Sequence, residues 1–170
     1  MAVNPAAQAA QLFATAYGVL VTGGAKALPA TTSGDIFTVT GGRVIITSLT
    51  GVVSTVIQAQ ATTLSVGNKP AGGSSAVATL CATADLNGKP VGTSLAVPLA
   101  KASALIVSGA DGTLVWNGSS GAQGNAFSSG GLALVPAGTI QVTTGASSTG
   151  AITWSATWVP YDAGASLVAA

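Results

Sequence analysis

Hydrophobic and polar residues alternate with a period of two near the end of the chain. The stretch from Ala151 to Val159 divides into an apolar set and a hydroxyl set: Ile152, Trp154, Ala156 and Trp158 against Thr153, Ser155 and Thr157. Successive side chains of a β-strand point to opposite faces, so this pattern predicts a strand with both tryptophans on one face. The stretch from Thr139 to Thr144 alternates in the same way.

The stretch from Asp35 to Val66 is rich in Val, Ile and Thr, which favour strands over helices. Gly41-Gly42 and Thr50-Gly51 divide it into three runs of strand length: Ile36–Thr40, Arg43–Leu49 and Val52–Ala61. Strands joined by two-residue glycine breaks predict a meander of antiparallel hairpins. Together with the later strands, this predicts an all-β fold, an antiparallel β-sandwich or jelly roll.

The remaining segments predict short strands separated by turns. Asn87-Gly88 and Asp111-Gly112 favour tight hairpins, and Asn87-Gly88 fits a type I′ turn. The predicted strands are residues 76–84, 91–99, 104–107, 113–116 and 132–135. Residues 117–131 predict a loop, and the chain trails off after Pro160, which ends the last strand.

Residues 1–34 differ from the β-rich remainder, so we divide the chain into an N-terminal arm, 1–34, and a β-sandwich domain, 35–170. Ala6–Ala16 favours a short helix with only Leu12 and Phe13 as an apolar face. So short a helix is marginal alone in water, which predicts that the arm becomes ordered on another surface. The alternative is that it packs on its own domain, with Gly18–Val21 as a strand.

Charged residues are unusually rare in this chain. They make up 5% of the sequence, with a formal net charge of +1, whereas an ordinary soluble domain has about 25%. A surface with so little charge repulsion favours self-association, which indicates that other subunits cover much of it. A dilute extracellular domain is the alternative. The five basic residues are scattered, which argues against nucleic-acid binding, and no apolar run reaches membrane-spanning length.

Candidate catalytic and ligand-binding residues are few. The chain has no His, and Cys81 is its one cysteine, so we expect neither a nucleophilic triad nor a zinc site, and no cofactor. Two of the four Asp residues could form a pair of glycosidase type, but Asp35, Asp111 and Asp162 lie at a strand start, a turn and a strand end, which are ordinary positions for Asp. Four aromatic residues would suit either a sugar-stacking platform or core or interface packing: Trp116, Trp154, Trp158 and Tyr161. We therefore predict a protein that is not an enzyme.

Two stretches resemble small virion proteins of tailed bacteriophages. They are SGDIFTVTGGRVIITSLTGVVSTVIQAQ (33–60) and VPAGTIQVTTGASSTGAITWSATWVPYDAGASLVAA (135–170). They carry a TGGRV hairpin, the VPAGTI turn and a Trp-rich last strand followed by a Pro-Tyr-Asp-x-Gly tail. The resemblance implies a capsid decoration, or cement, protein on the capsid surface of the virion. It implies β-rich subunits, often homotrimers, that bind the major capsid protein and tie capsomers together. It implies no catalytic residues.

This function predicts contact surfaces on the N-terminal arm and in the region Trp158–Asp162. The candidate interface residues are Leu12, Phe13, Tyr17, Trp158, Tyr161 and Asp162. The alternative function is a receptor- or carbohydrate-binding virion module, such as a head fibre or tail tip, which would use exposed tryptophans.

Overall fold

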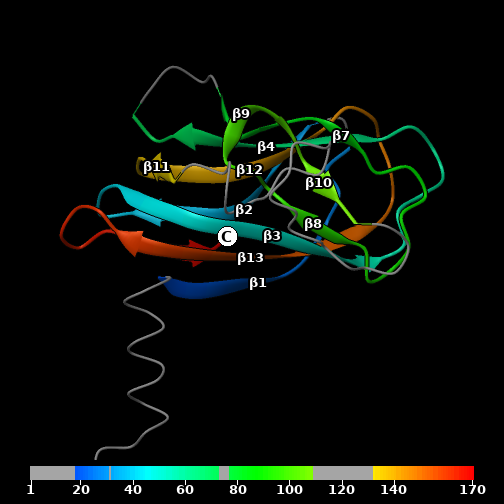
Figure 1. The fold of residues 1–170 in the computed structure, drawn as a ribbon. Helices are drawn as coiled ribbons and strands as arrows, with labels where there is room; N and C mark the ends of the chain where they lie inside the picture. The colour runs from blue at the N-terminus through cyan, green and yellow to red at the C-terminus, as the bar shows by residue number, and fades with distance from the viewer. Residues whose placement is uncertain (1–17, 31, 73–76, 109–131) are drawn as a thin grey trace, which may run out of the picture.

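The computed structural model describes residues 18–30, 32–72, 77–108 and 132–170. In these residues the protein is all-β, and its antiparallel sheets pack face to face as a β-sandwich (Figure 1). The predicted fold class is thereby confirmed. The helix expected at Ala6–Ala16, the hairpin at Asp111-Gly112, the strand at 113–116 and the loop at 117–131 lie outside the described residues.

Two six-stranded sheets make up the sandwich. Sheet A runs in the order β1 (Val19–Ala27), β13 (Ala151–Pro160), β3 (Val44–Thr55), β8 (Ser94–Ala96) and β10 (Ile106–Val107), and β11 (Ala133–Val135) also pairs with β3. Sheet B runs in the order β14 (Ser166–Ala169), β2 (Ser33–Thr40), β12 (Gly138–Thr144), β4 (Thr63–Pro70) and β5 (Ala78–Thr79), and β7 (Ala84–Asp85) also pairs with β4. A small parallel pair joins β6 (Cys81–Ala82) to β9 (Ala100–Ala104).

The core lies between the two sheets and follows the period of two. On β13 every second residue faces inward, and Trp154 is 1% exposed and Trp158 9% exposed. Phe37 on β2 and Ile140 on β12 are fully buried from the opposite sheet. The predicted tryptophan strand is therefore confirmed, and its apolar face forms part of the main core.

The predicted meander at residues 35–61 is wrong in two respects. First, β2 and β3 lie in different sheets, and Gly41-Gly42 carries the chain between the sheets instead of closing a hairpin. Both glycines have positive φ, 72° and 145°. A glycine pair suits either kind of sharp turn, so the local sequence does not distinguish a hairpin from a corner between sheets.

Second, β3 runs through the break that Thr50-Gly51 predicted. Gly51 faces the core opposite Trp154 of β13. A Cβ atom at Gly51 would lie 2.9 Å from Ile152 Cγ2 and 3.0 Å from Trp154 Cε3. The glycine therefore makes room for the indole ring, a packing role that glycine commonly has inside a strand.

The structure places part of the expected arm inside the sandwich. β1 pairs along its length with β13, with a bulge between Thr22 and Ala25, so the predicted strand at Gly18–Val21 exists and packs on its own domain. For these residues the alternative of packing on the same domain holds. The segment after Pro160 does not trail off, because β14 pairs with β2 at the edge of sheet B. That prediction was wrong.

The turn at Asn87-Gly88 is present but is not type I′. Gly88 has φ +61°, whereas Asn87 does not have the positive φ that a type I′ turn requires. The Lys89 amide donates to the Leu86 carbonyl at 3.2 Å, which closes the turn. The long strands predicted at 76–84 and 91–99 are reduced to β5, β6, β7 and β8.

Candidate interaction surface

The outer face of sheet A carries no charged side chain on its four neighbouring strands β1, β13, β3 and β11. Strand register and alternation place these residues on it: Leu20, Thr22, Ile45, Thr50, Val52, Leu134, Thr153, Ser155, Thr157 and Val159. Lys26 is the single charged residue within these strands, and it pairs with the inward residue Ile152. Its Nζ donates to the carbonyl of Ala170, away from this face.

Hydroxyl groups on this face hydrogen-bond to one another across the strands. Thr22 Oγ1 lies 3.0 Å from Ser155 Oγ, and Thr47 Oγ1 lies 2.7 Å from Thr157 Oγ1. Dehydrating a hydroxyl that already has a protein hydrogen-bond partner costs less free energy than dehydrating an unpaired one, because the pair keeps its hydrogen bond when it is buried. The face is therefore polar, yet comparatively easy to dehydrate against a partner protein.

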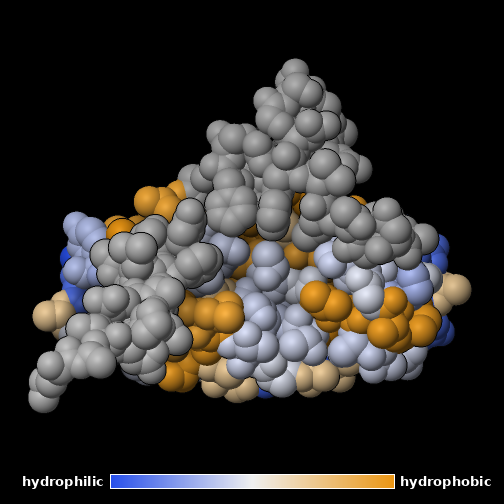
Figure 2. Space-filling view, turned by 60° about the horizontal axis from the view of Figure 1, so that its bottom comes forward, coloured by the Kyte–Doolittle hydropathy of each residue, from blue (hydrophilic) through white to orange (hydrophobic). Residues whose placement is uncertain are grey.

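Aliphatic side chains lie beside the hydroxyl rows. Ile45 pairs with Val159 on one side and with Leu134 on the other, so the three form a row across the sheet. Leu134 is 48% exposed, and Leu20 on β1 is 65% exposed. Figure 2 shows residues of intermediate hydropathy between two groups of hydrophobic residues. Such a mixture of aliphatic and paired-hydroxyl groups suits burial against another protein.

β1 also presents an edge of sheet A. Among the described residues, no strand pairs with the other edge of β1. From Val19 to Thr22 the strand contains neither proline nor a charged residue, the two features that commonly block strand addition. This edge is therefore able to accept a strand from another chain by main-chain hydrogen bonding.

A charged cluster fixes the corner at which β2 passes to β3. Arg43 Nε and Nη2 donate to Asp162 Oδ2 and Oδ1 at 2.9 and 2.8 Å, and the Arg43 amide donates to Asp162 Oδ2 at 2.8 Å. The guanidinium lies over the ring of Tyr161, 4.6 Å from its centroid. The cluster ties the turn before β3 to the turn after β13. Hydrogen bonds from Arg43 lower the pKa of Asp162 from 3.8 to about 2.

This shift predicts how stability depends on pH. Because the folded-state pKa is depressed, the contribution of Asp162 is complete above about pH 4 and is lost as the pH falls towards about 2. Asp162→Asn should therefore lower the melting temperature at pH 7 and have little effect at pH 2. Thermal unfolding of both proteins at the two pH values measures this, with Arg43→Met as the matched loss of the partner. An equal effect at both pH values would contradict the assignment.

The predicted interface residues have different environments. Tyr161 is 54% exposed and Asp162 is ion-paired at the surface, so both are accessible at the corner. Trp158 is buried in the core, and its indole N–H has no hydrogen-bond partner in the described part of the chain. Leu12, Phe13 and Tyr17 lie outside the described residues.

The outer face of sheet A was not predicted from the sequence as a candidate interaction surface. Its signal was present, because the residues that alternate with the buried tryptophans are Thr153, Ser155 and Thr157. What was missing was the register that sets them beside Thr22, Thr47 and Leu20. Of the two roles that the sequence left open for the tryptophans, core packing is the one that Trp154 and Trp158 have, because both are buried.

Reactive and ligating groups are dispersed in the structure. Among the described residues, no three His, Cys, Asp or Glu side chains come together as a metal site. Asp85 Oδ1 accepts from the amides of Thr62 and Asn87, which is a turn role. Burial raises the pKa of the Cys81 thiol, which makes it a poor nucleophile. No helix in the described ranges has the length and apolarity to span a membrane.

The chain was also compared with known proteins. It matches no protein-family model, no curated protein and no solved structure.

Proposed function

We propose that this protein is a structural virion subunit, a capsid decoration or cement protein that binds the major capsid protein on the outside of a tailed-phage head. The observation that carries the proposal is the uncharged outer face of sheet A, with its paired hydroxyls and its row of aliphatic residues. The resemblance of residues 33–60 and 135–170 to such virion proteins supports the same conclusion. A homotrimer is part of the proposal, and sedimentation of the native protein tests it.

Attachment through this face would derive its free energy from apolar burial and from strand addition at β1. Ion pairs would contribute little, because the described residues of this face on β1, β13, β3 and β11 include no charged side chain. This distinguishes the proposal from attachment by charge complementarity, which salt weakens. The proposal also accounts for a content of only 5% charged residues, because a surface that is covered in the assembled particle needs little charge to remain in solution.

The first test is the salt dependence of attachment to undecorated heads. We expect the purified protein to bind them at about 1 M NaCl nearly as well as at low salt, because at about 1 M the Debye length is only about 3 Å. Co-sedimentation with heads measures the bound fraction. Loss of binding in high salt would contradict the proposal.

The second test places a charge on each face of the sandwich. Leu20→Lys adds one to the outer face of sheet A and should reduce attachment at least tenfold, because a desolvated, unpaired charge costs well over about 1.4 kcal/mol. The matched control is Val168→Lys on sheet B, where Val168 pairs with Thr38 and is 49% exposed. Equal losses in both variants, or none in either, would exclude sheet A as the attachment face.

The alternative of a carbohydrate-binding virion module by tryptophan stacking is weakened by burial. Two of its three candidate tryptophans, Trp154 and Trp158, belong to the core. Trp116 lies outside the described residues, and Tyr161 is 54% exposed but has the Arg43 guanidinium over its ring. The proposal of an attachment subunit needs no exposed tryptophan and is therefore preferred.

A further inference from the structure

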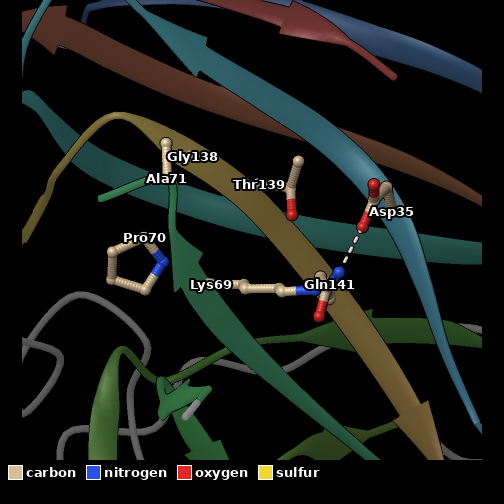
Figure 3. Close-up of a pocket in the computed structure, with 7 residues that line it drawn as sticks. All are labelled: Asp35, Lys69, Pro70, Ala71, Gly138, Thr139 and Gln141. Atoms are coloured by element: carbon tan, nitrogen blue, oxygen red, sulfur yellow. Dashed lines mark hydrogen bonds between the residues drawn. The ribbon is translucent and has the colours of Figure 1, made fainter. Parts of the chain in front are cut away.

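Sheet B carries a polar hollow on its outer face, on the side of the sandwich opposite the proposed attachment face. The hollow has a volume of about 310 Å³. It is lined by residues of three neighbouring strands and the turn after β4: Asp35, Lys69, Pro70, Ala71, Gly138, Thr139 and Gln141. Figure 3 shows Asp35 on β2 and Lys69 on β4 on the two sides of Thr139 and Gln141 of β12.

The floor of the hollow is a buried amide held in a fixed position. Gln141 is 7% exposed, and its Nε2 donates to Asp35 Oδ1. A bulge between Ile140 and Gln141 sets Gln141 opposite Asp35 in the pairing of β12 with β2. An amide buried to this extent on the outer face of a sheet is unusual, because outward positions normally face water. Its position is determined by the strand register.

Several hydrogen-bonding groups of the hollow remain available to a ligand. Within the described residues, the Lys69 ammonium and the Thr139 hydroxyl have no partner, and the Gln141 side chain has none besides Asp35. Asp35 likewise keeps one carboxylate oxygen free of protein partners there. The hollow thus offers acceptors on the β2 side and donors on the β4 side, and Pro70 and Ala71 form an apolar wall.

We propose that this hollow binds a neutral saccharide unit. Adjacent hydroxyls of a pyranose both donate and accept, so they would donate to Asp35 and the Gln141 oxygen and accept from Lys69 and Thr139. The charges of Asp35 and Lys69 oppose each other, which gives no net attraction for a simple ion. The Pro70–Ala71 wall fits the C–H face of a sugar ring. This site is independent of the proposed attachment function, and both faces can be occupied together.

The test titrates sugars into the intact ¹⁵N-labelled protein and follows its amide signals. The probes are the methyl glycosides of glucose, mannose, galactose and N-acetylglucosamine, with glycine and inorganic phosphate as zwitterionic and anionic comparisons. We expect at least one glycoside to shift the amides of Asp35, Lys69, Thr139 and Gln141. Absence of shifts there with every glycoside, or shifts produced by glycine or phosphate alone, would overturn the proposal.

Two exposed-lysine variants distinguish the hollow from non-specific binding. Lys69→Met should weaken glycoside binding about tenfold, the effect of losing one charge-assisted hydrogen bond. Lys101→Met removes the same charge from exposed β9, outside the hollow, and should leave binding unchanged. Asp35→Asn keeps an acceptor for Gln141 and should also weaken binding about tenfold. Equal binding by Lys69→Met and the unmodified protein, or equal losses in the two lysine variants, would reject the site.

Discussion

Replacing Trp154 by alanine is expected to lower the free energy of unfolding by about 3–5 kcal/mol, the range measured for large aromatic residues in protein cores. Trp154 is 1% exposed and lies at the centre of β13, between its partners β1 and β3. The glycine opposite, Gly51, leaves space that the indole fills together with the side chain of Ile152. Truncation would therefore leave a large cavity that rigid neighbouring strands cannot close. Domains of this size have only about 5–15 kcal/mol of total stability.

Denaturant unfolding followed by circular dichroism measures this loss. Val91→Ala is the control, because Val91 is 58% exposed and its truncation should change stability by no more than about 0.5 kcal/mol. A loss below about 1.5 kcal/mol for Trp154→Ala would mean that the indole is not the centre of the core.

Gly138→Ala is expected to destabilise the protein by about 3 kcal/mol or more, through backbone strain and a collision between strands. Gly138 begins β12 with φ +146°, a conformation that residues with a Cβ atom rarely adopt. A Cβ here would lie 2.1 Å from the Lys69 carbonyl oxygen and 2.8 Å from the Pro70 Cα. Both are main-chain atoms of the paired strand β4, so relief requires β4 to move away from β12.

The matched control is Gly24→Ala. Gly24 also lies in a strand, but its φ is not positive and nothing lies within 4 Å of the added Cβ. We expect a change of no more than about 0.5 kcal/mol in Gly24→Ala, measured by the same unfolding experiment. Similar free energies of unfolding for the two variants would show that strand β4 moves to accommodate the added Cβ atom of Gly138→Ala without loss of stability.

The two faces of the sandwich are suited to different partners. In the described ranges, the outer face of sheet A combines aliphatic residues with paired hydroxyls and has no charged side chain on β1, β13, β3 or β11, which favours a dry protein interface. The outer face of sheet B carries Asp35, Lys69 and the buried Gln141 amide around a hollow, which favours a small polar ligand. The two proposals are therefore tested independently, and failure of one leaves the other standing.

Part of the outer face of sheet A could be predicted from the alternation of polar and apolar residues alone. The hydroxyls of Thr153, Ser155 and Thr157 had to face away from the buried tryptophans, because side chains alternate along a strand. Their pairing with Thr22 and Thr47 was not predictable, since those residues lie far away in sequence. The hollow on sheet B could not be predicted either, because it requires Asp35 of β2, Gln141 of β12 and Lys69 of β4 to lie next to one another in the folded sheet.

By itself, the sequence determined the β-strand character, the buried face of β13 and the near absence of charge, because these follow from side-chain chemistry and a local period of two. Only the tertiary structure decided that Gly41-Gly42 joins two sheets, that Gly51 accommodates an indole and that β1 and β14 complete the sheet edges. Those outcomes depend on which strands pair across the chain, and a strand's own residues specify its faces but not its neighbours.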